Sequence, residues 1–256
     1  MTNKTAFERV LDARSKDKIK IKTLVNGITD NFIELHGDRA YGDDEAVYAG
    51  IGSLNCQPVT IIGIRKGDDE VSDAEVHFGS AEPDGYRKAL RLMKQAEKFN
   101  RPVITLINTP GAYPDVEAEY HGQGYMISQL ILQGMQLKVP YISVIVGEGG
   151  SGGALALAVG DCVWAFENSI YSILSPEGYA TILWKDSSRA QEAAEVMKLT
   201  PADLIKQGII DKIIPEVQTS TEIKQFKTQL FDKIEELKAM PEAEMLTKRF
   251  ARYRKF

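Results

Sequence analysis

The chain has 256 residues, which is enough for one large domain with a substantial core or for two small domains. Its net charge of −5 gives no support to a nucleic-acid-binding surface, and no apolar run is long enough to span a membrane. Cys56 and Cys162 are the only cysteines, which excludes a disulfide framework and a cysteine-based zinc site, and the polar start MTNKTAFERV leads us to expect a cytoplasmic protein without a signal peptide.

The chain begins with a segment of helical periodicity. Phe7, Val10 and Leu11 recur at helical spacing, and residues 19–33 continue the pattern less regularly. We therefore expect residues 4–34 to be helical, and we interpret residues 1–34 as a helical arm that packs on the main domain or on a partner. Residues 35–256 form a single domain in this interpretation.

Strand and helix patterns alternate through the rest of the chain. Strands are expected at 46–54, 59–65, 103–108, 141–146, 162–166, 170–174 and 209–214. Helices are expected to begin at Pro83, near Gly122, after the N-cap Ser175, at Ala190, at Pro201, after the capping box Thr219/Glu222 and at Glu242. The alternation, with a β-β-α rhythm that appears more than once, predicts an α/β domain.

Two basic surfaces are predicted to face solvent. One is the side of the helix from Pro83 that carries Arg87 and Lys88, largely opposite an apolar face with Tyr86. The other is the tail after Glu242, which is basic at its end. We expect this tail to be a surface helix that docks elsewhere.

The segment 140–160, PYISVIVGEGGSGGALALAVG, organises the chain. An apolar run stops at Gly147, five glycines fall within residues 147–153, and helix formers resume at Ala154. This order predicts a buried strand, a loop made largely of backbone and a buried helix. Backbone N–H groups of the glycines and of the helix start would hold negative charge, either on a phosphate or on an oxyanion that develops during a reaction.

A second break follows the strand at 103–108, in the segment 109–114, TPGAYP. In parallel α/β sheets, ligands gather at the carboxyl ends of the strands. We therefore predict that this segment and the glycine segment belong to one site.

Phosphate binding fits the glycine segment poorly. The P-loop ending Gly-Lys-Ser/Thr is absent, and Glu148 would repel a pyrophosphate, so the match of Gly147, Gly149 and Gly152 to G-x-G-x-x-G has low weight. The histidines are isolated, which disfavours a metal site. Glu148 and the nearby Glu117 and Glu119 could act as paired acids, but we expect these carboxylates to be exposed in loops.

A catalytic serine nucleophile is the main alternative to a site that only binds negative charge. Residues 149–153 fit G-x-S-x-G between a strand and a helix, with Ser151 at the centre. However, His36, His77 and His121 all precede Ser151, whereas the folds with this elbow place histidine after serine. An oxyanion hole without a nearby protein nucleophile remains, which suits reactions through an enolate.

Four ordered motifs resemble the carboxyltransferase α subunit of bacterial acetyl-CoA carboxylase. They are FGSAEPDGYRKA at 78–89, NTPGAYP at 108–114, GEGGSGGALA at 147–156 and SPEG at 175–178, preceded by ELHGDR at 34–39. The resemblance extends to about Lys212 and covers most of the chain. It implies a crotonase/ClpP-like spiral of β-β-α units with an N-terminal helical arm.

The resemblance also implies a reaction and partners. A carboxyl group passes from carboxybiotin, held on a biotin carrier protein, to acetyl-CoA and gives malonyl-CoA, the first committed step of fatty acid synthesis. A β subunit of the same fold completes the active site, usually as α2β2, and carries the zinc. Biotin carboxylase is a further component, and no DNA or membrane partner is expected.

The site residues implied by the resemblance lie in the two segments and in the SPEG motif. The expected catalytic set is Gly152 and Gly153 as oxyanion-hole N–H donors, with Gly149 and Gly150. The expected substrate-binding set is Gly111, Ala112, Tyr113, Ser175 and Glu177, and no metal ligand is expected on this chain. A ClpP-like or esterase-like hydrolase that uses Ser151, a propionyl-CoA-type carboxyltransferase and a non-catalytic acyl-CoA-binding subunit stay open as alternatives.

Overall fold

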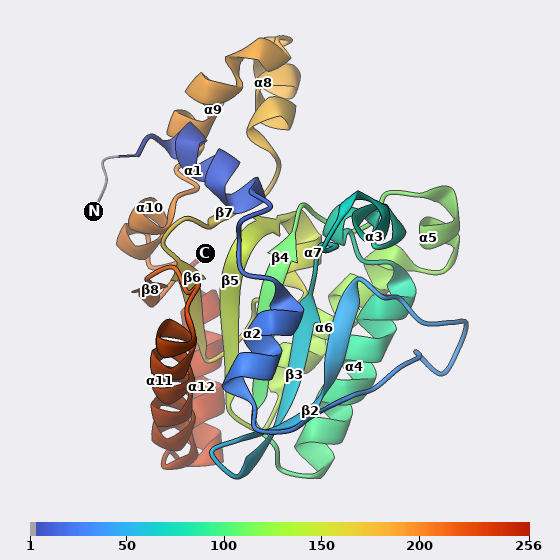
Figure 1. The fold of residues 1–256 in the computed structure, drawn as a ribbon, viewed down its shortest axis with the longest axis vertical. Helices are drawn as coiled ribbons and strands as arrows, with labels where there is room; N and C mark the ends of the chain where they lie inside the picture. The colour runs from blue at the N-terminus through green and yellow to red at the C-terminus, as the bar shows by residue number, and fades with distance from the viewer. Residues whose placement is uncertain (1–3) are drawn as a thin grey trace.

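The structure, a computed structural model, describes residues 4–256 and is built on one eight-stranded sheet (Figure 1). The strands are β1 (Phe32–Glu34), β2 (Val47–Leu54), β3 (Gln57–Ile64), β4 (Val103–Thr109), β5 (Tyr141–Gly150), β6 (Cys162–Phe166), β7 (Ile170–Ser172) and β8 (Lys212–Ile214). Their order is β1-β2-β3-β4-β5-β6-β8, and β7 pairs with β5. The first three strands are antiparallel, whereas all pairs from β3 onward are parallel. The predicted α/β class is confirmed.

Helices cover both faces of the sheet. The longer ones are α1 (Ala6–Arg14), α2 (Ile21–Ile28), α4 (Pro83–Lys98), α6 (Gln123–Gln136), α8 (Pro176–Trp184), α9 (Ala190–Met197), α11 (Ser220–Lys238) and α12 (Glu242–Tyr253). The shorter ones are α3 (Glu70–Glu75), α5 (Val116–Tyr120), α7 (Ser151–Leu155), α10 (Pro201–Lys206) and the 3-10 turns η1 (His77–Gly79) and η2 (Ser187–Arg189). The predicted caps at Ser175 and Thr219 are confirmed, because each hydroxyl accepts the backbone N–H three residues on.

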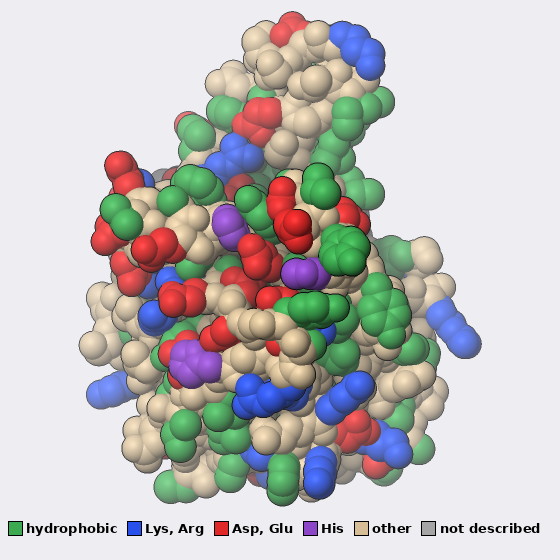
Figure 2. Space-filling model, turned by 90° about the vertical axis from the view of Figure 1, so that its right-hand side faces the viewer, with side chains coloured by type: hydrophobic (Ala, Val, Ile, Leu, Met, Phe, Trp, Pro, Cys, Tyr) green, Lys and Arg blue, Asp and Glu red, His purple; other side chains and the backbone are tan. Residues whose placement is uncertain are grey.

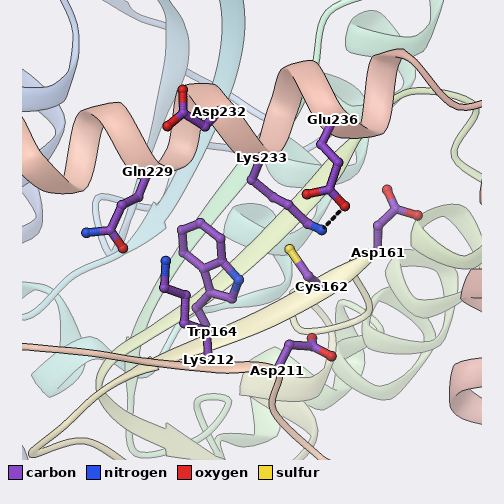
Figure 3. Close-up of a pocket in the computed structure, with 9 residues that line it drawn as sticks. All are labelled: Asp161, Cys162, Trp164, Asp211, Lys212, Gln229, Asp232, Lys233 and Glu236. Atoms are coloured by element: carbon purple, nitrogen blue, oxygen red, sulfur yellow. Dashed lines mark hydrogen bonds and ion pairs between the residues drawn. The ribbon is translucent and has the colours of Figure 1, made fainter.

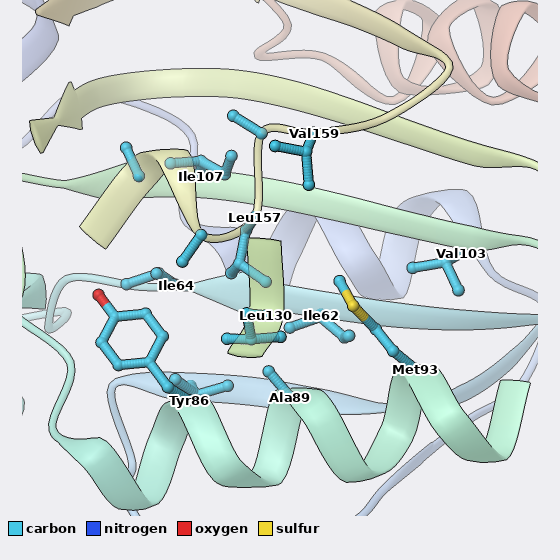
Figure 4. Close-up of a cluster of buried hydrophobic side chains, with 14 of the residues drawn as sticks. Ile62, Ile64, Tyr86, Ala89, Met93, Val103, Ile107, Leu130, Leu157 and Val159 are labelled. Carbon is cyan, nitrogen blue, oxygen red and sulfur yellow. The ribbon is translucent and has the colours of Figure 1, made fainter. Parts of the chain in front are cut away.

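Each face of the sheet has its own apolar core. On one face, α2 and α11 pack against β3, β4, β5 and β6. On the other face, α4 and α6 pack through residues such as Tyr86, Met93 and Leu130 against Ile62 and Ile107 (Figure 4). The five buried residues of α11 lie three or four positions apart, so that they form one apolar face, and they are Ile223, Phe226, Leu230, Ile234 and Leu237.

A smaller lobe projects beyond the carboxyl end of β5. It consists of α8, η2 and α9, with α1 packed beside α9 (Figure 1). A separate apolar cluster joins Val10 and Ala13 of α1 to Ile170 and Ala194. The N-terminal helices thus pack on the rest of the chain, and the proposed division at residue 34 stays a prediction.

Some expected boundaries are wrong. The helical pattern ends at Ile28, and Phe32–Glu34 pairs with Gly50–Gly52 as strand β1, because alternating burial replaces helical periodicity there. The glycine segment is not a loop. Strand β5 continues through Gly150, and helix α7 starts at Ser151 and ends at Leu155.

One cation of each basic surface is buried, whereas Lys94, Lys248, Arg254 and Lys255 are exposed as predicted. Lys88 is 1% exposed, and its ammonium donates to the carbonyl of Asp44 at 2.8 Å and forms an ion pair with Asp43. Arg249 is 1% exposed and bonds to Asp161 and to three backbone carbonyls. Buried cations need such partners, so α4 and α12 are anchored to the domain by these residues. No helix within residues 4–256 is long and apolar enough to cross a membrane.

Candidate active site

The two predicted site segments lie against each other at the carboxyl ends of β4 and β5. Thr109 is in register with Gly149. A Cβ on Gly150 would lie 2.0 Å from the carbonyl oxygen of Pro110, and one on Gly153 would lie 2.5 Å from the nitrogen of Ala112. Such distances leave no room for a side chain, so glycine is needed for the two segments to meet.

Most glycines of the segment therefore serve packing between protein atoms. A Cβ on Gly147 would lie 2.4 Å from Asn108 Oδ1, and one on Gly149 would lie 3.0 Å from the ring of Tyr171. Gly152 differs, because its nearest neighbour would be Ile127 at 3.6 Å, an ordinary contact. Gly111 also has room, with φ of +148°, a conformation that favours glycine. Open backbone for a ligand is thus confined to a few positions.

Three amide groups meet at this junction. The first N–H groups of a helix have no partner within it, and those of Gly152 and Gly153 lie in the first turn of α7. Among the hydrogen bonds of residues 4–256, none is donated by the amide of Ala112. The nitrogen of Ala112 lies next to Gly153, 2.5 Å from the position of a Cβ there, so this amide borders the start of α7.

Residues 109–114, which include Ala112, form one wall of the candidate site. Thr109 fixes the conformation of this wall. Its buried hydroxyl donates to the carbonyl of Gly111 at 2.9 Å and accepts from the N–H of Gly111 at 3.1 Å. Tyr113, the next residue of the wall, stacks on His77 with ring centroids 3.9 Å apart. The side chain of Gln123 donates to the carbonyl of Tyr113 at 3.1 Å. The wall is therefore held from several sides.

A largely apolar cavity of about 760 Å³ opens beside Ser151 and Gly152. Its other lining residues include Leu155, Tyr171, Met197 and Tyr253. This volume lies in the range typical of small-molecule sites. A ligand in the cavity would face the start of α7.

Ion pairs that the sequence analysis missed lie behind the site. Glu148 is 6% exposed, and its carboxylate binds Arg14 at 2.8 Å and Lys66. The expectation of an exposed loop carboxylate is therefore wrong for Glu148. Arg14 also binds Glu177 at 2.8 Å; this bond and the one to Glu148 raise the pKa of Arg14, and Arg14 lowers the pKa of Glu177. The position of Glu148 inside the glycine run was the only local signal.

The predicted residues of the SPEG motif make contacts within the chain. The hydroxyl of Ser175 accepts from the N–H of Gly178 at 3.0 Å. The carboxylate of Glu177 is bound by Arg14. Neither residue lines the apolar cavity. Their predicted contact with substrate stays a prediction.

Ser151 has no histidine partner in the part of the chain that the structure describes. Its φ of +52° is unusual for serine. His36 contacts Asp43, His77 contacts Glu82, and His121 stacks on Tyr41. None of the hydrogen bonds within residues 4–256 joins a histidine to Ser151, so a serine-hydrolase triad receives no support.

A second cavity, of about 430 Å³, lies at the opposite end of the sheet, where β6 begins (Figure 3). Asp161, Cys162, Asp211 and Lys233 are among its lining residues. Burial raises the pKa of the Cys162 thiol. The cavity contains no predicted site residue, and no group of three or more potential metal ligands occurs in the described residues.

Comparison with known sequences gives a consistent result. A family model described as "Acetyl co-enzyme A carboxylase carboxyltransferase-like" matches residues 1–256. The acetyl-coenzyme A carboxylase carboxyl transferase subunit alpha of Streptococcus thermophilus (strain ATCC BAA-491 / LMD-9) is 54% identical over 247 residues, which are 96% of this chain and 96% of that protein. The protein of the same name from Streptococcus equi subsp. equi (strain 4047) is 52% identical over 255 residues, which are 98% and 100% of the two chains.

Solved structures share the fold at low sequence identity. Transcarboxylase 12S, with methylmalonyl-coenzyme A and methylmalonic acid bound, matches with a TM-score of 0.71 and 19% identity over 87% of this chain and 42% of that chain. A Pseudomonas malonate decarboxylase hetero-tetramer in complex with coenzyme A matches with a TM-score of 0.67 and 15% identity, over 82% and 86% of the chains. The predicted crotonase-like fold is confirmed.

Proposed function

Because the chain belongs to the family of acetyl-CoA carboxylase carboxyltransferase α subunits, we propose how its own residues contribute to carboxyl transfer. The chain is a subunit of a biotin-dependent carboxyltransferase. We propose that it transfers the carboxyl group to acetyl-CoA, which gives malonyl-CoA. Carboxybiotin on a carrier protein supplies the carboxyl group and a ureido nitrogen base.

The N–H groups of Gly152 and Gly153 are the proposed donors to the ureido oxygen of biotin, which becomes negative during the reaction. The N–H group of Ala112 is the proposed third donor. The main observation behind this proposal concerns the backbone N–H of Ala112. It donates no hydrogen bond among the described residues, and its nitrogen lies 2.5 Å from the position of a Cβ on Gly153. Backbone donors fixed before the reaction need no reorganisation when charge develops, and one such donor is typically worth about two to three powers of ten in rate. Gly150 contributes by allowing β5 to meet residues 109–114, and Gly149 by allowing β5 to pack against Tyr171 of β7.

The apolar cavity beside Gly152 is the proposed site for the bicyclic ring system of biotin, which carries one polar ureido oxygen. Its volume of about 760 Å³ and its lining by Leu155, Met197 and Tyr171 support this assignment. Gly111 and Tyr113 form the proposed substrate wall. Ser175 and Glu177 hold the start of α8, and we propose that they border the substrate side.

A β subunit is the proposed partner that completes the site, with zinc on that subunit and α2β2 as the assembly. Exposed apolar side chains beside the substrate wall support this proposal. Val116 and Tyr120 of α5 are 82% and 85% exposed, and Tyr125 and Leu132 of α6 are 65% and 49% exposed. Figure 2 shows hydrophobic, acidic and histidine side chains together on one face of the molecule. Exposed apolar clusters of this kind typically mark protein interfaces.

The biotin carrier protein and biotin carboxylase are further proposed partners. The cytoplasm is the proposed compartment, in keeping with the unpaired thiols of Cys56 and Cys162. We propose acetyl-CoA rather than propionyl-CoA as the substrate on the basis of the family alone. The pocket cannot decide between them, because one methylene changes the binding free energy by only about 1–3 kcal/mol.

The test is decarboxylation of malonyl-CoA in the presence of free biocytin, the reverse reaction. The chain, its candidate β subunit and their mixture are assayed side by side. Activity in the mixture alone supports a shared site, and Gly152→Val is expected to abolish it while the complex stays intact. A folded, verified complex that does not turn over would contradict the proposal, and labelling of Ser151 by a fluorophosphonate probe would then favour the hydrolase.

A further inference from the structure

Tyr86 carries a buried hydroxyl that has no partner. The side chain lies on α4 and is 0% exposed. Within residues 4–256 its hydroxyl is one of the few buried side-chain polar atoms without a hydrogen bond. Tyr141 is equally buried, but its hydroxyl donates to the carbonyl of Leu157 at 2.7 Å. Since native proteins rarely leave a buried polar group unpaired, the free hydroxyl of Tyr86 needs an explanation.

The hydroxyl of Tyr86 lies at the junction of the two site segments. A Cβ built on Gly153 would be 2.7 Å from this hydroxyl and 2.5 Å from the nitrogen of Ala112. The same point is 2.8 Å from the carbonyl carbon of Gly111. The hydroxyl and the Gly111–Ala112 peptide therefore flank the same small space above Gly153. Figure 4 shows the Tyr86 side chain rising from α4 into the core.

The hydroxyl is available as a donor. Burial, and then the nearby charge of Asp44, raise the pKa of Tyr86, so the group keeps its proton at physiological pH. The carbonyl oxygen of Gly111 is a suitable acceptor, because it has two lone pairs and Thr109 occupies only one of them. A second donor on this carbonyl would polarise the peptide and strengthen the Ala112 N–H as a donor.

Resting on the proposed function, we infer that Tyr86 is a positioning residue for carboxyl transfer, whose hydroxyl donates to the Gly111 carbonyl when negative charge develops at the Ala112 N–H. Phenylalanine would fill the same volume without an unpaired hydroxyl. In this proposal, the unpaired hydroxyl lowers the stability of the free chain, and its hydrogen bond stabilises the transition state. This division of roles is expected where function and stability compete.

The test compares Tyr86→Phe with Tyr141→Phe, each in the complex with the β subunit. Tyr86→Phe is expected to keep or raise the thermal unfolding midpoint, because it removes an unpaired buried group. It is expected to lower kcat about tenfold, the value of one hydrogen bond, with KM for the acyl-CoA unchanged. Tyr141→Phe is expected to do the opposite: it lowers the midpoint and keeps kcat, because it removes a hydrogen bond already made in the free chain.

The outcomes separate the two proposals. Turnover by wild type and equal turnover by Tyr86→Phe would overturn the role of Tyr86 alone. A lower midpoint of Tyr86→Phe with unchanged kcat would show that the hydroxyl is only structural. No turnover by the wild-type complex would overturn the proposed function, and with it the inference.

Discussion

Gly152 and Gly153 are sequence neighbours in different surroundings, and this makes them a matched pair. A Cβ on Gly152 would meet only Ile127 at ordinary distance, whereas one on Gly153 would overlap the Ala112 amide and the Tyr86 hydroxyl. Alanine also favours a helix over glycine by about 0.5–1 kcal/mol. A methyl group added at Gly152 would face the cavity, whereas one added at Gly153 would disturb packing inside the protein. Comparing the two alanine variants therefore distinguishes these effects.

We predict that Gly152→Ala keeps or raises the thermal unfolding midpoint, while Gly153→Ala lowers the free energy of unfolding by about 1–3 kcal/mol through overpacking. Thermal unfolding of both variants and the wild type checks this. Equal midpoints for the two variants would contradict the described contact between Gly153 and the wall.

Ser151 permits a second test at the scale of one residue. Its φ of +52° is costly for serine, by about 1–2 kcal/mol, and nearly free for glycine. We predict that Ser151→Gly raises the free energy of unfolding by about 1 kcal/mol and keeps most of the carboxyltransferase activity. Loss of activity in both Ser151→Gly and Ser151→Ala, with unchanged folding, would instead indicate that the hydroxyl takes part in the reaction.

Residue roles could be predicted where they depend on local sequence. The cap at Ser175 and the capping box at Thr219 involve residues three positions apart, and both were predicted. The partners of Glu148, Lys88 and Arg249 lie 134, 45 and 88 residues away along the chain. No local pattern encodes such pairing, so these buried charges were assigned to the surface. The packing role of the glycines was missed for the same reason.

At the scale of elements, Arg14 joins three segments. It belongs to the last turn of α1 and binds Glu148 of β5 and Glu177 of α8. The projecting lobe is thereby tied to the strand that ends in the site. Because α8 follows β7, which pairs with the last residues of β5, the lobe is also joined to β5 through the sheet.

We predict a pH-dependent contribution of the Arg14–Glu177 pair to stability. Arg14 holds the pKa of Glu177 below its ordinary value of 4.5. A lowered carboxyl pKa stabilises the fold fully above pH 4.5, and the contribution is lost as the pH falls through the lowered pKa. Wild type should exceed Glu177→Gln by about 1 kcal/mol in free energy of unfolding at pH 7, since the pair is partly exposed, and by nothing in strong acid.

Denaturant unfolding of both proteins across this pH range measures the difference. Glu192→Gln is the control, because Glu192 belongs to the same lobe and binds Arg189 in a more exposed pair at 2.7 Å. It should change stability little at any pH. A difference for Glu177→Gln that does not shrink in acid would contradict the ion pair.

At the scale of the whole molecule, the sequence patterns predicted most elements and the α/β class. Strand β6 and the first residue of helix α9, Ala190, were predicted correctly, because the sequence pattern changes clearly at these positions. The mutual contact of the two site segments was inferred from the rule for parallel strands. The extension of β5 through Gly150 was not, because glycines usually end a strand and here the pairing with β7 keeps them extended.

The apolar face of α5 and α6 gives a prediction for assembly. Tyr120→Asp, at a side chain 85% exposed, should raise the Kd for the β subunit at least tenfold and leave the isolated chain folded. Phe99→Asp is the control, since Phe99 is 57% exposed at the far end of α4. Titration calorimetry and circular dichroism check the two effects. Equal Kd values for the two variants would place the interface elsewhere.

Helix α12 sets the order in which the molecule can be completed during synthesis. The carbonyls of Gly134, Leu137 and Val139 and the carboxylate of Asp161 receive the guanidinium of Arg249, which the ribosome adds roughly a hundred residues later. Until then these groups must be bonded to water, and the cavity beside Gly152 lacks the wall that Tyr253 provides. The proposed oxyanion donors, Gly152 and Gly153, are therefore synthesised before Tyr253, which lines the cavity. The lining of this cavity can be complete only after the last helix has been translated.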